Sequence, residues 1–280
     1  MRKLNRIISL ILMFGFFGIV AGLSNAFAAK QNIVIDGSTT VLPIAQICAE
    51  EYMAKNGAVN ITVKGGGSGV GITSLIEKTC NIADSSRAIK QQEIEKAVSK
   101  NVEPVAHIVA MDGIAVIVNK SNPVKNLTKK DLLNIYTGKV KFWNQIDGYQ
   151  GENKQIVVLS RDTASGTYEA FAELALNKQK VKKDALTNAS NKAIASIVQT
   201  TPGAIGYVGL GYLNDNIKAV TVESVVCNET NILRAKYPLS RPLFMYTNGV
   251  PKGAVKDFID FVLSKEGQDL VAEAGFVKIK

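Results

Sequence analysis

Short apolar runs alternate with segments of helical periodicity in the first part of the chain. Strand-like runs occupy residues 32–36, 59–64 and 82–84, and a turn rich in glycine, serine or threonine follows each of them. This alternation predicts βαβ units and a mostly parallel sheet. The helices expected after these turns cover residues 41–55, 72–78 and 91–100.

The same pattern continues to the end of the chain. We expect two strand segments within residues 107–118, separated at Met111–Gly113, and a helix at 129–136 for which Thr128 is a suitable N-cap. One long amphipathic helix is predicted for residues 256–273. Further strands are expected at 156–160, 204–208 and 241–247, and further helices at 168–177 and 188–199.

The first residues have the three parts of a secretory signal peptide. A cationic stretch at residues 1–6 precedes the apolar run 7–23, and Ala26-Phe27-Ala28 then gives the A-x-A arrangement of a cleavage site. We therefore predict a signal peptide at residues 1–28, cleaved after Ala28, and an exported periplasmic protein. A retained membrane anchor is the alternative, because the apolar run is at the lower limit of a spanning helix.

Composition places the chain among ordinary globular proteins. It has 280 residues, of which 46% are hydrophobic and 20% charged, and this excludes intrinsic disorder and a dense disulfide scaffold. The formal net charge is +9, but the lysines are dispersed and no cluster of basic and aromatic residues occurs, so a nucleic-acid partner is not expected. A positive field instead favours the approach of a small anion.

The cysteines and the histidine indicate no catalytic or metal site. Cys48, Cys80 and Cys227 match no zinc spacing, and in an oxidising compartment Cys48 and Cys80 could form a disulfide. His107 lies in the apolar run VAHIVAM, where a packed core histidine is expected rather than a general base. We predict no cofactor and no metal.

Three turns between a strand and a helix share the chemistry of anion binding. They are GSTT at 37–40, GGGSGVG at 65–71 and TASGT at 163–167, with Arg161 just before the third. Helix N-termini offer unpaired backbone N–H groups and a favourable dipole, and glycine allows a ligand close to the backbone. The guanidinium of Arg161 can pair with an oxyanion at two points. The three turns would together surround a small oxyanion.

Each of these features also has a simpler explanation. A serine or threonine before a helix commonly acts as an N-cap alone. Enzyme motifs are not met, since no Gly-Lys-Ser/Thr follows the glycines of a P-loop and Ser68 is not in a G-x-S-x-G elbow. Aspartates near strand ends could bind a metal, but such residues more often cap helices or pair with arginine; they are Asp36, Asp84, Asp112 and Asp162.

Several segments spread over nearly the whole mature chain share the pattern of one known family. They are GSTTVLPIA, GGGSGVGI, NIADSSR, LTKKDLLNIYTGKVKFWNQI, SRDTASGTYEAF, PGAIGYVGLGY and KDFIDFVLSKEGQDLV. With these segments the chain resembles the periplasmic phosphate-binding proteins of phosphate ABC importers. The resemblance implies an α/β protein with the type II periplasmic-binding-protein fold, in which two lobes enclose a ligand cleft and are joined by hinge strands.

The resemblance also implies a domain organisation and partners. Residues 29–113 and 243–280 would form the first lobe and residues 114–242 the second. The protein would be a monomer that captures inorganic phosphate and delivers it to an inner-membrane ABC permease. Two alternatives remain open at this point: another tetrahedral oxyanion such as sulfate or arsenate, and a secreted phosphoester hydrolase with Ser68 or Ser165 as nucleophile and Asp84 assisting.

The expected binding residues follow from the family's motifs, with one departure. In better-known members, an aspartate after the third strand accepts the proton of hydrogen phosphate and thereby rejects sulfate; alignment of NIADSSR places Ser86 there. Asp84 could substitute for that aspartate, and Arg87 is adjacent. The expected phosphate-binding residues are Ser38, Thr39, Thr40, Ser68, Gly69, Ser86, Arg161, Ser165, Gly166 and Thr167, with Asp84 and Arg87 as secondary candidates.

Overall fold

The fold is described from a computed structural model that covers residues 30–152 and 154–279. The expected signal peptide and its cleavage site lie outside the described residues. The strands are β1 (Gln31–Gly37), β2 (Val59–Gly65), β3 (Ile82–Ser85), β4 (Pro104–Asn119), β5 (Asn126–Leu127), β6 (Val157–Arg161), β7 (Leu186–Asn188), β8 (Ala204–Gly209), β9 (Ile217–Ala219), β10 (Thr221–Val222) and β11 (Ser240–Asn248). The helices are α1 (Leu42–Lys55), α2 (Ser68–Ile76), α3 (Gln91–Ser99), α4 (Lys129–Tyr136), α5 (Gly166–Ala175), α6 (Asn191–Thr200), α7 (Glu229–Leu233), α8 (Gly253–Leu263) and α9 (Lys265–Glu273).

One mixed sheet runs through the molecule. Its strand order is β2-β1-β3-β11-β4-β8-β6-β7, and β9 pairs with β4. Strands β1, β2 and β3 are parallel to one another, as are β6, β7 and β8, whereas every pairing made by β4 or β11 is antiparallel. The expectation of a mostly parallel sheet is therefore wrong, because these two long strands add as many antiparallel pairings as there are parallel ones.

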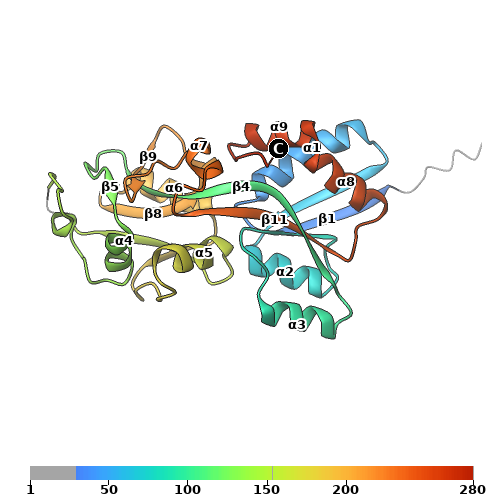
Figure 1. Cartoon of the computed structure of the whole chain (residues 1–280), viewed down its shortest axis with the longest axis horizontal. Helices are drawn as coiled ribbons and strands as arrows, with labels where there is room; N and C mark the ends of the chain where they lie inside the picture. The colour runs from blue at the N-terminus through green and yellow to red at the C-terminus, as the bar shows by residue number, and fades with distance from the viewer. Residues whose placement is uncertain (1–29, 153, 280) are drawn as a thin grey trace, which may run out of the picture.

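Strands β4 and β11 connect two groups of helices (Figure 1). Residues Pro104–Gly113 of β4 pair with β11, and from Ile114 onward the same strand pairs with β8 and β9. We expected two strand segments in this region, but the structure has one strand of 16 residues. Asp112 and Gly113 do not break the strand; its pairing changes there from β11 to β8.

Most local expectations agree with the structure, but the last helix is divided. Thr128 caps α4 as expected, since its hydroxyl accepts a hydrogen bond from the Asp131 amide. The expected helix 256–273 is in fact α8 and α9, which meet at Ser264. The Ser264 hydroxyl accepts a hydrogen bond from the Gly267 amide and so starts a new helix instead of continuing the old one.

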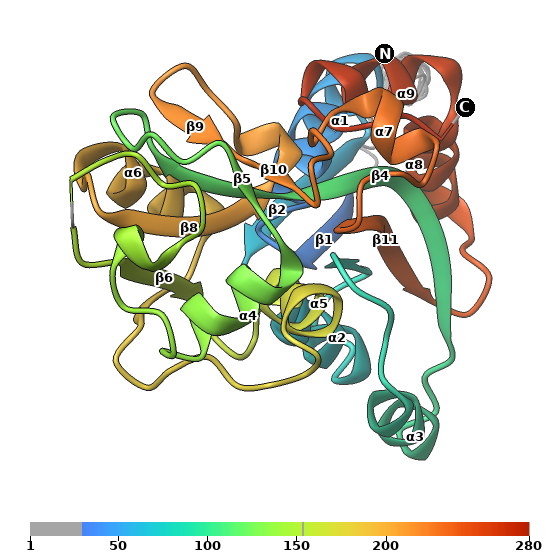
Figure 2. The same ribbon diagram turned by 60° about the vertical axis from the view of Figure 1, so that its left-hand side comes forward.

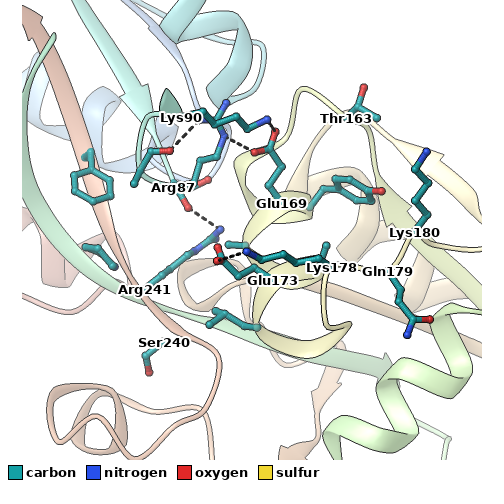
Figure 3. A pocket seen from close by; sticks show the side chains of 18 residues that line it. Arg87, Lys90, Thr163, Glu169, Glu173, Lys178, Gln179, Lys180, Ser240 and Arg241 are labelled. Atoms are coloured by element: carbon teal, nitrogen blue, oxygen red, sulfur yellow. Dashed lines mark hydrogen bonds and ion pairs between the residues drawn. The ribbon is translucent and has the colours of Figure 1, made fainter. Parts of the chain in front are cut away.

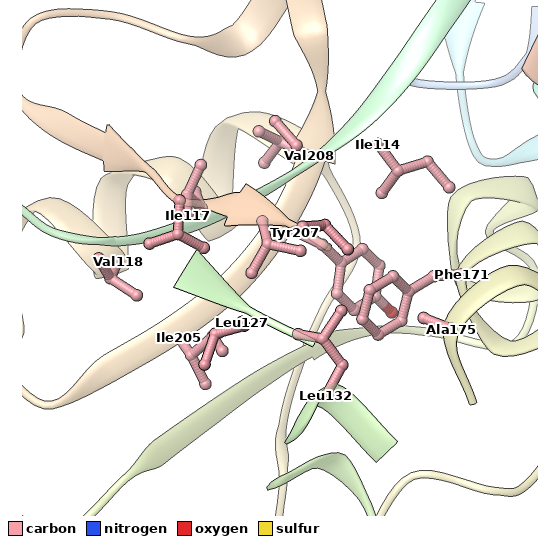
Figure 4. Close-up of a cluster of buried hydrophobic side chains, with 14 of the residues drawn as sticks. Ile114, Ile117, Val118, Leu127, Leu132, Phe171, Ala175, Ile205, Tyr207 and Val208 are labelled. Atoms are coloured by element: carbon pink, nitrogen blue, oxygen red, sulfur yellow. The ribbon is translucent and has the colours of Figure 1, made fainter. Parts of the chain in front are cut away.

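The hydrophobic side chains form separate clusters on the two sides of the β4–β11 connection. The cluster around β8 and α5 takes its buried members from residues 114–239, with Val277 added. Figure 4 shows Phe171 and Tyr207 together within this cluster. Their rings stack with centroids 4.1 Å apart. The two clusters around α1 and α2 draw on residues 33–110 and 243–276. Figure 2 shows α1, α2 and α3 on the side away from β6 and β8.

The structure answers the open question of a disulfide and corrects the expectation for the histidine. Cys48, Cys80 and Cys227 are all buried free thiols, so the possible Cys48–Cys80 disulfide is not formed. His107 is not a core residue; it is half-buried on β4 and lies 2.9 Å from the Thr247 hydroxyl. Within residues 30–152 and 154–279, no helix combines the length and the apolar character that a bilayer crossing requires.

Candidate functional site

The first turn holds three buried hydroxyl groups between β1 and α1. Ser38, Thr39 and Thr40 are each at most 6% exposed. The Ser38 hydroxyl accepts hydrogen bonds from the amides of Thr40 and Val41, so it shapes the turn itself. Gly37 is required here: its φ is +137°, and a Cβ atom would lie 2.2 Å from the carbonyl oxygen of Asp84.

The second turn leads from β2 directly into α2. The amides of Gly66 and Gly67 donate to the carbonyl of Gly37 and so hold this turn against the first. Helix α2 begins at Ser68, four residues earlier than expected, and the side chain of Ser68 is fully buried. Its hydroxyl accepts a hydrogen bond from the Ser86 amide at 3.0 Å and lies 3.3 Å from the Ser86 hydroxyl.

The third turn leads from β6 into α5. Ser165 is the N-cap of α5, and its hydroxyl accepts from the Tyr168 amide. The amide of Gly69 donates to the carbonyl of Ala164 at 2.9 Å, which ties the second turn to the third. Both Ser165 and Thr167 are 1% exposed.

The turns converge on one buried cluster of polar side chains. The hydroxyls of Thr40 and Thr167 are 2.8 Å apart, and the Arg161 guanidinium donates to the Thr39 hydroxyl at 3.1 Å. At Gly166 a Cβ atom would lie 2.3 Å from the Ser68 hydroxyl and 2.7 Å from that of Ser86. Turns distant in sequence therefore place three helix N-termini and their hydroxyls around one point, which the sequence alone did not establish.

Arg161 has the electrostatics of an anion-binding group. Its side chain is 3% exposed; Nε donates to the carbonyl of Asn188 and Nη2 to that of Ala189, whereas Nη1 has no partner among the described residues. No carboxylate within the described ranges forms an ion pair with it. Burial lowers the pKa of Arg161, but a guanidinium keeps its proton in proteins. A buried cation without a counter-ion is costly, so this position is suited to a bound anion.

Two of the expected residues have other surroundings. Arg87 forms ion pairs with Glu93 at 2.7 Å and Glu169 at 2.8 Å, and so faces away from the hydroxyl cluster. Asp84 is fully buried, and neither carboxylate oxygen has a hydrogen-bond partner among the described residues. Burial, with a smaller contribution from Asp36, raises the pKa of Asp84 well above its usual range.

The structure adds Asn191 to the cluster, a residue that the sequence analysis did not select. Asn191 is fully buried at the first position of α6, where Ser190 is the N-cap. Its Nδ2 donates to the hydroxyls of Thr39 and Thr40 at 3.2 and 3.0 Å, and its Oδ1 accepts from the Gly209 amide. The sequence predicted that this helix begins at residue 188. With that start, Ser190 was not recognised as the N-cap, and Asn191 was not placed at the first position of the helix.

Arg241 and Asp112 are two further buried residues at the cluster. Arg241 on β11 is 5% exposed and donates to the Thr167 hydroxyl at 3.0 Å, and Asp112 on β4 forms an ion pair with it at 2.8 Å. Pairing with arginine was one of the three roles considered for Asp112, and the structure shows this pairing. One charged residue in each of two apolar strands is a sequence signal for such a pair, because buried charges require partners. No group of three potential metal ligands occurs among the described residues.

A pocket of about 770 Å³ opens beside the cluster. Ser86 and Arg241 belong to its lining, together with Arg87, Lys90 and Glu169. Figure 3 shows Glu169 on α5 facing Arg87 and Lys90 on the opposite wall. The pocket lies between α5 and the segment after β3, and it brings solvent close to two members of the cluster.

Comparison with known proteins identifies the class to which this fold and site belong. A family model described as a PBP superfamily domain matches residues 24–266, so the chain has a mixed α/β fold of that superfamily, as expected. A phosphate-binding protein PstS from Bacillus subtilis is 30% identical over 99% of this chain and 95% of its own length. The chain therefore belongs to the PstS family of phosphate-binding proteins.

Solved structures agree with this assignment. A putative phosphate ABC transporter substrate-binding protein with bound phosphate, from Clostridium perfringens, has a TM-score of 0.82 at 34% identity, covering 89% of this chain and 100% of that one. An ABC-type phosphate transport receptor from Vibrio cholerae has a TM-score of 0.72 at 30% identity, covering 88% and 99%. The family consists of binding proteins, which confirms the expectation that the chain is not an enzyme and removes the hydrolase alternative.

Proposed function

We propose that this protein binds inorganic phosphate at the cluster formed by the three turns and delivers it to an ABC importer. The observation that carries the proposal is the buried Arg161 guanidinium, whose Nη1 has no hydrogen-bond partner among the described residues and which forms no ion pair with a described carboxylate. A phosphate oxygen accepts readily from such a donor, and the surrounding hydroxyls can donate to the other oxygens.

The binding residues are proposed from this geometry and from the family's motifs. Arg161 would supply the charge, and Gly69 and Gly166 would allow close approach of the backbone. Ser38 would act through the turn that its hydroxyl shapes, because its own amide already donates to the carbonyl of Asp84. The hydroxyl donors would be Thr39, Thr40, Ser68, Ser86, Ser165 and Thr167, with Asn191 and Arg241 added by the structure.

We also propose that the two sides of the molecule act as lobes that close on the anion. The first would comprise residues 29–113 and 243–280 and the second residues 114–242. The separate hydrophobic clusters support this division, because each side has its own buried core. The long strands β4 and β11 would then contain the hinge.

Export and transport partners complete the proposal. The A-x-A site supports cleavage after Ala28 and a periplasmic location. The names of similar proteins from Clostridium perfringens and Vibrio cholerae, a transporter's substrate-binding protein and a transport receptor, support a membrane permease as the partner. We propose that the protein acts as a monomer.

Isothermal titration of the phosphate-stripped protein with phosphate tests the proposal. Tight one-to-one binding is expected, and Arg161→Ala should weaken it by well over tenfold, since a hydrogen bond to a charged group contributes about 1.5–3 kcal/mol. Arg234→Ala is the matched control, because Arg234 is exposed and distant from the turns in sequence. Titrations with sulfate and arsenate separate phosphate binding from general oxyanion binding. Unchanged binding in Arg161→Ala would contradict the site.

A further inference from the structure

A tyrosine far along the chain contacts the first anion-binding turn. The hydroxyl of Tyr212 donates to the backbone carbonyl of Thr39, 173 residues away in the sequence. Tyr212 ends a short 3₁₀-helix, Leu210–Tyr212, that follows β8. It is also the last residue of PGAIGYVGLGY, one of the segments that carry the resemblance to phosphate-binding proteins. The proposed binding residues do not include Tyr212, so its contact with the turn needs its own explanation.

The Thr39 carbonyl requires a donor from outside its own helix. Hydrogen bonds of the helical type already begin in the turn, since the Leu42 amide donates to the carbonyl of Ser38. The corresponding donor for Thr39 would be residue 43, which is a proline and has no N–H. No backbone amide in the described part of the chain donates to this carbonyl, and Thr39 is only 6% exposed. Tyr212 thus supplies the hydrogen bond that Pro43 cannot make.

The peptide unit between Thr39 and Thr40 is held at both ends. Its carbonyl accepts from Tyr212, and its amide donates to the Ser38 hydroxyl at 3.1 Å. The N–H and C=O of a trans peptide point in opposite directions, so these two contacts fix the plane of the peptide. Rotation of this peptide would displace both threonine hydroxyls and would redirect a carbonyl oxygen, which repels an anion. The contact with Tyr212 therefore controls the geometry of the first turn.

The side chain of Thr39 is also held from the same part of the chain as its carbonyl. Arg161 and Asn191 donate to the Thr39 hydroxyl at 3.1 and 3.2 Å. All three donors to Thr39 belong to the second proposed lobe, residues 114–242, whereas Thr39 belongs to the first. A phosphate oxygen accepts more strongly than a hydroxyl and would compete for Arg161. An anion cannot replace the donor of a carbonyl, so the contact with Tyr212 persists when phosphate is bound.

The Tyr212 side chain is well placed to hold this turn. Its ring packs against the cluster around β8 and α5 and also against the cluster around α1. The neighbouring Gly211 lies so close to the C-terminal segment that a Cβ atom would come within 2.4 Å of the Phe276 ring. Burial raises the pKa of Tyr212 to about 12, so the hydroxyl keeps its proton near neutral pH. The hydroxyl thus remains a donor at a defined position.

We propose that Tyr212 is a positioning residue of the phosphate site: its hydroxyl fixes the Thr39 carbonyl and thereby holds the first turn in the arrangement that binds the anion. This inference rests on the proposed function. Without the hydroxyl, the buried carbonyl either stays unpaired or rotates with its peptide, and both are unfavourable in the closed, anion-bound state. Tyr212 acts through Thr39 and does not itself need to touch phosphate.

The Tyr212→Phe variant tests the inference because it removes the hydroxyl and keeps the ring. Isothermal titration of the phosphate-stripped variant should show an affinity for phosphate about tenfold lower than that of the wild type. Stopped-flow displacement should assign most of this loss to faster dissociation, since the contact joins the two proposed lobes and forms as they close. A hydroxyl that only supported the fold would lower the urea midpoint of the ligand-free protein and leave the dissociation rate unchanged.

Tyr149→Phe is the matched control. Tyr149 is also a half-buried tyrosine whose hydroxyl donates to a backbone carbonyl, that of Glu152 at 3.2 Å. It lines a pocket that contains no residue of the anion cluster. Its variant should therefore bind and release phosphate as the wild type does.

Pro43→Ala provides a rescue that is specific to this mechanism. Alanine has an N–H that can donate to the Thr39 carbonyl within the helix, so the double variant Tyr212→Phe/Pro43→Ala should recover most of the lost affinity. Wild-type dissociation in a folded Tyr212→Phe, a loss that Pro43→Ala does not restore, or a Tyr212→Phe protein that does not fold would overturn this inference alone. Absence of phosphate binding by the wild type would instead overturn the proposed function.

Discussion

The guanidinium of Arg87 lies 2.8 Å from the carboxylate of Glu169 and joins the segment after β3 to helix α5. Lys90 reaches the same carboxylate at 2.8 Å, and Arg87 is also held by Glu93. These contacts link the two proposed lobes directly beside the anion cluster. An ion pair made across a closing cleft stabilises the closed state and therefore slows the release of the ligand.

The Glu169→Gln variant should release phosphate faster than the wild type. Loss of the carboxylate removes both ion pairs on α5, and for a partly exposed pair we expect an effect of about 1 kcal/mol, or roughly fivefold in the dissociation rate. Stopped-flow displacement of phosphate measures this rate. Glu173→Gln is the matched control, since Glu173 lies one turn along α5 and, among the described residues, forms an ion pair only with Lys178 on the same side, with both side chains exposed. Equal rates for the two variants would argue against a link between the lobes.

The Gly166→Ala variant should lose phosphate affinity by more than about tenfold. The new methyl group would lie 2.3 Å from the Ser68 hydroxyl and 2.7 Å from the Ser86 hydroxyl, and both groups would have to move away from their positions in the cluster. Isothermal titration gives the affinity, and thermal unfolding shows whether the fold persists. Gly57→Ala serves as the control, because nothing lies within 4 Å of its added Cβ atom. A Gly166→Ala protein that binds as tightly as the wild type would show that this turn does not line the site.

Asp84 should make the stability of the protein pH-dependent. Its raised pKa means that the folded state binds the proton more tightly than the unfolded state does. The stability that this provides is complete below the unfolded pKa, near 3.9, and is lost as the pH rises toward the folded pKa. Asp84→Asn cannot ionise, so its free energy of unfolding should gain on that of the wild type between pH 5 and pH 8.

Urea unfolding of the ligand-free protein at both pH values measures this difference. Asp147→Asn is the control, because Asp147 is exposed. The pH-independent cost of burying an unpaired amide cancels in the comparison between the two pH values. A constant difference between Asp84→Asn and the wild type would mean that the Asp84 carboxyl group titrates as an ordinary exposed acid.

The three cysteines should be unreactive in the native protein and all available after unfolding. Burial raises the pKa of Cys48, Cys80 and Cys227 to about 12, so little thiolate forms near neutral pH. A chromogenic disulfide reagent should therefore react slowly without denaturant and titrate three thiols in urea without a reductant. One thiol in urea would show that a disulfide forms in the exported protein.

Local sequence patterns predicted much of the secondary structure. The β-rich runs before each turn and the cap at Thr128 depend on interactions between residues that are close in the sequence. The structure contains these elements, and their boundaries lie within a few residues of the predicted ones. The errors come from contacts between distant segments. Strand β4 continues through Asp112-Gly113 because β11 and β8 supply its hydrogen bonds in succession, and Ser264 caps α9 where the amphipathic pattern continues without interruption.

The sequence by itself determined the kinds of group available for anion binding: three hydroxyl-bearing turns, each between a strand and a helix, and an arginine beside the third. Tertiary structure decided that these groups meet, since Thr40 and Thr167 are 127 residues apart in the chain and 2.8 Å apart in space. It also decided which charges are paired, because Asp112 forms an ion pair with Arg241 from another strand, whereas Arg161 forms none with a carboxylate of the described residues. The strength of a charge depends on its burial and on its neighbours, and both are properties of the folded chain.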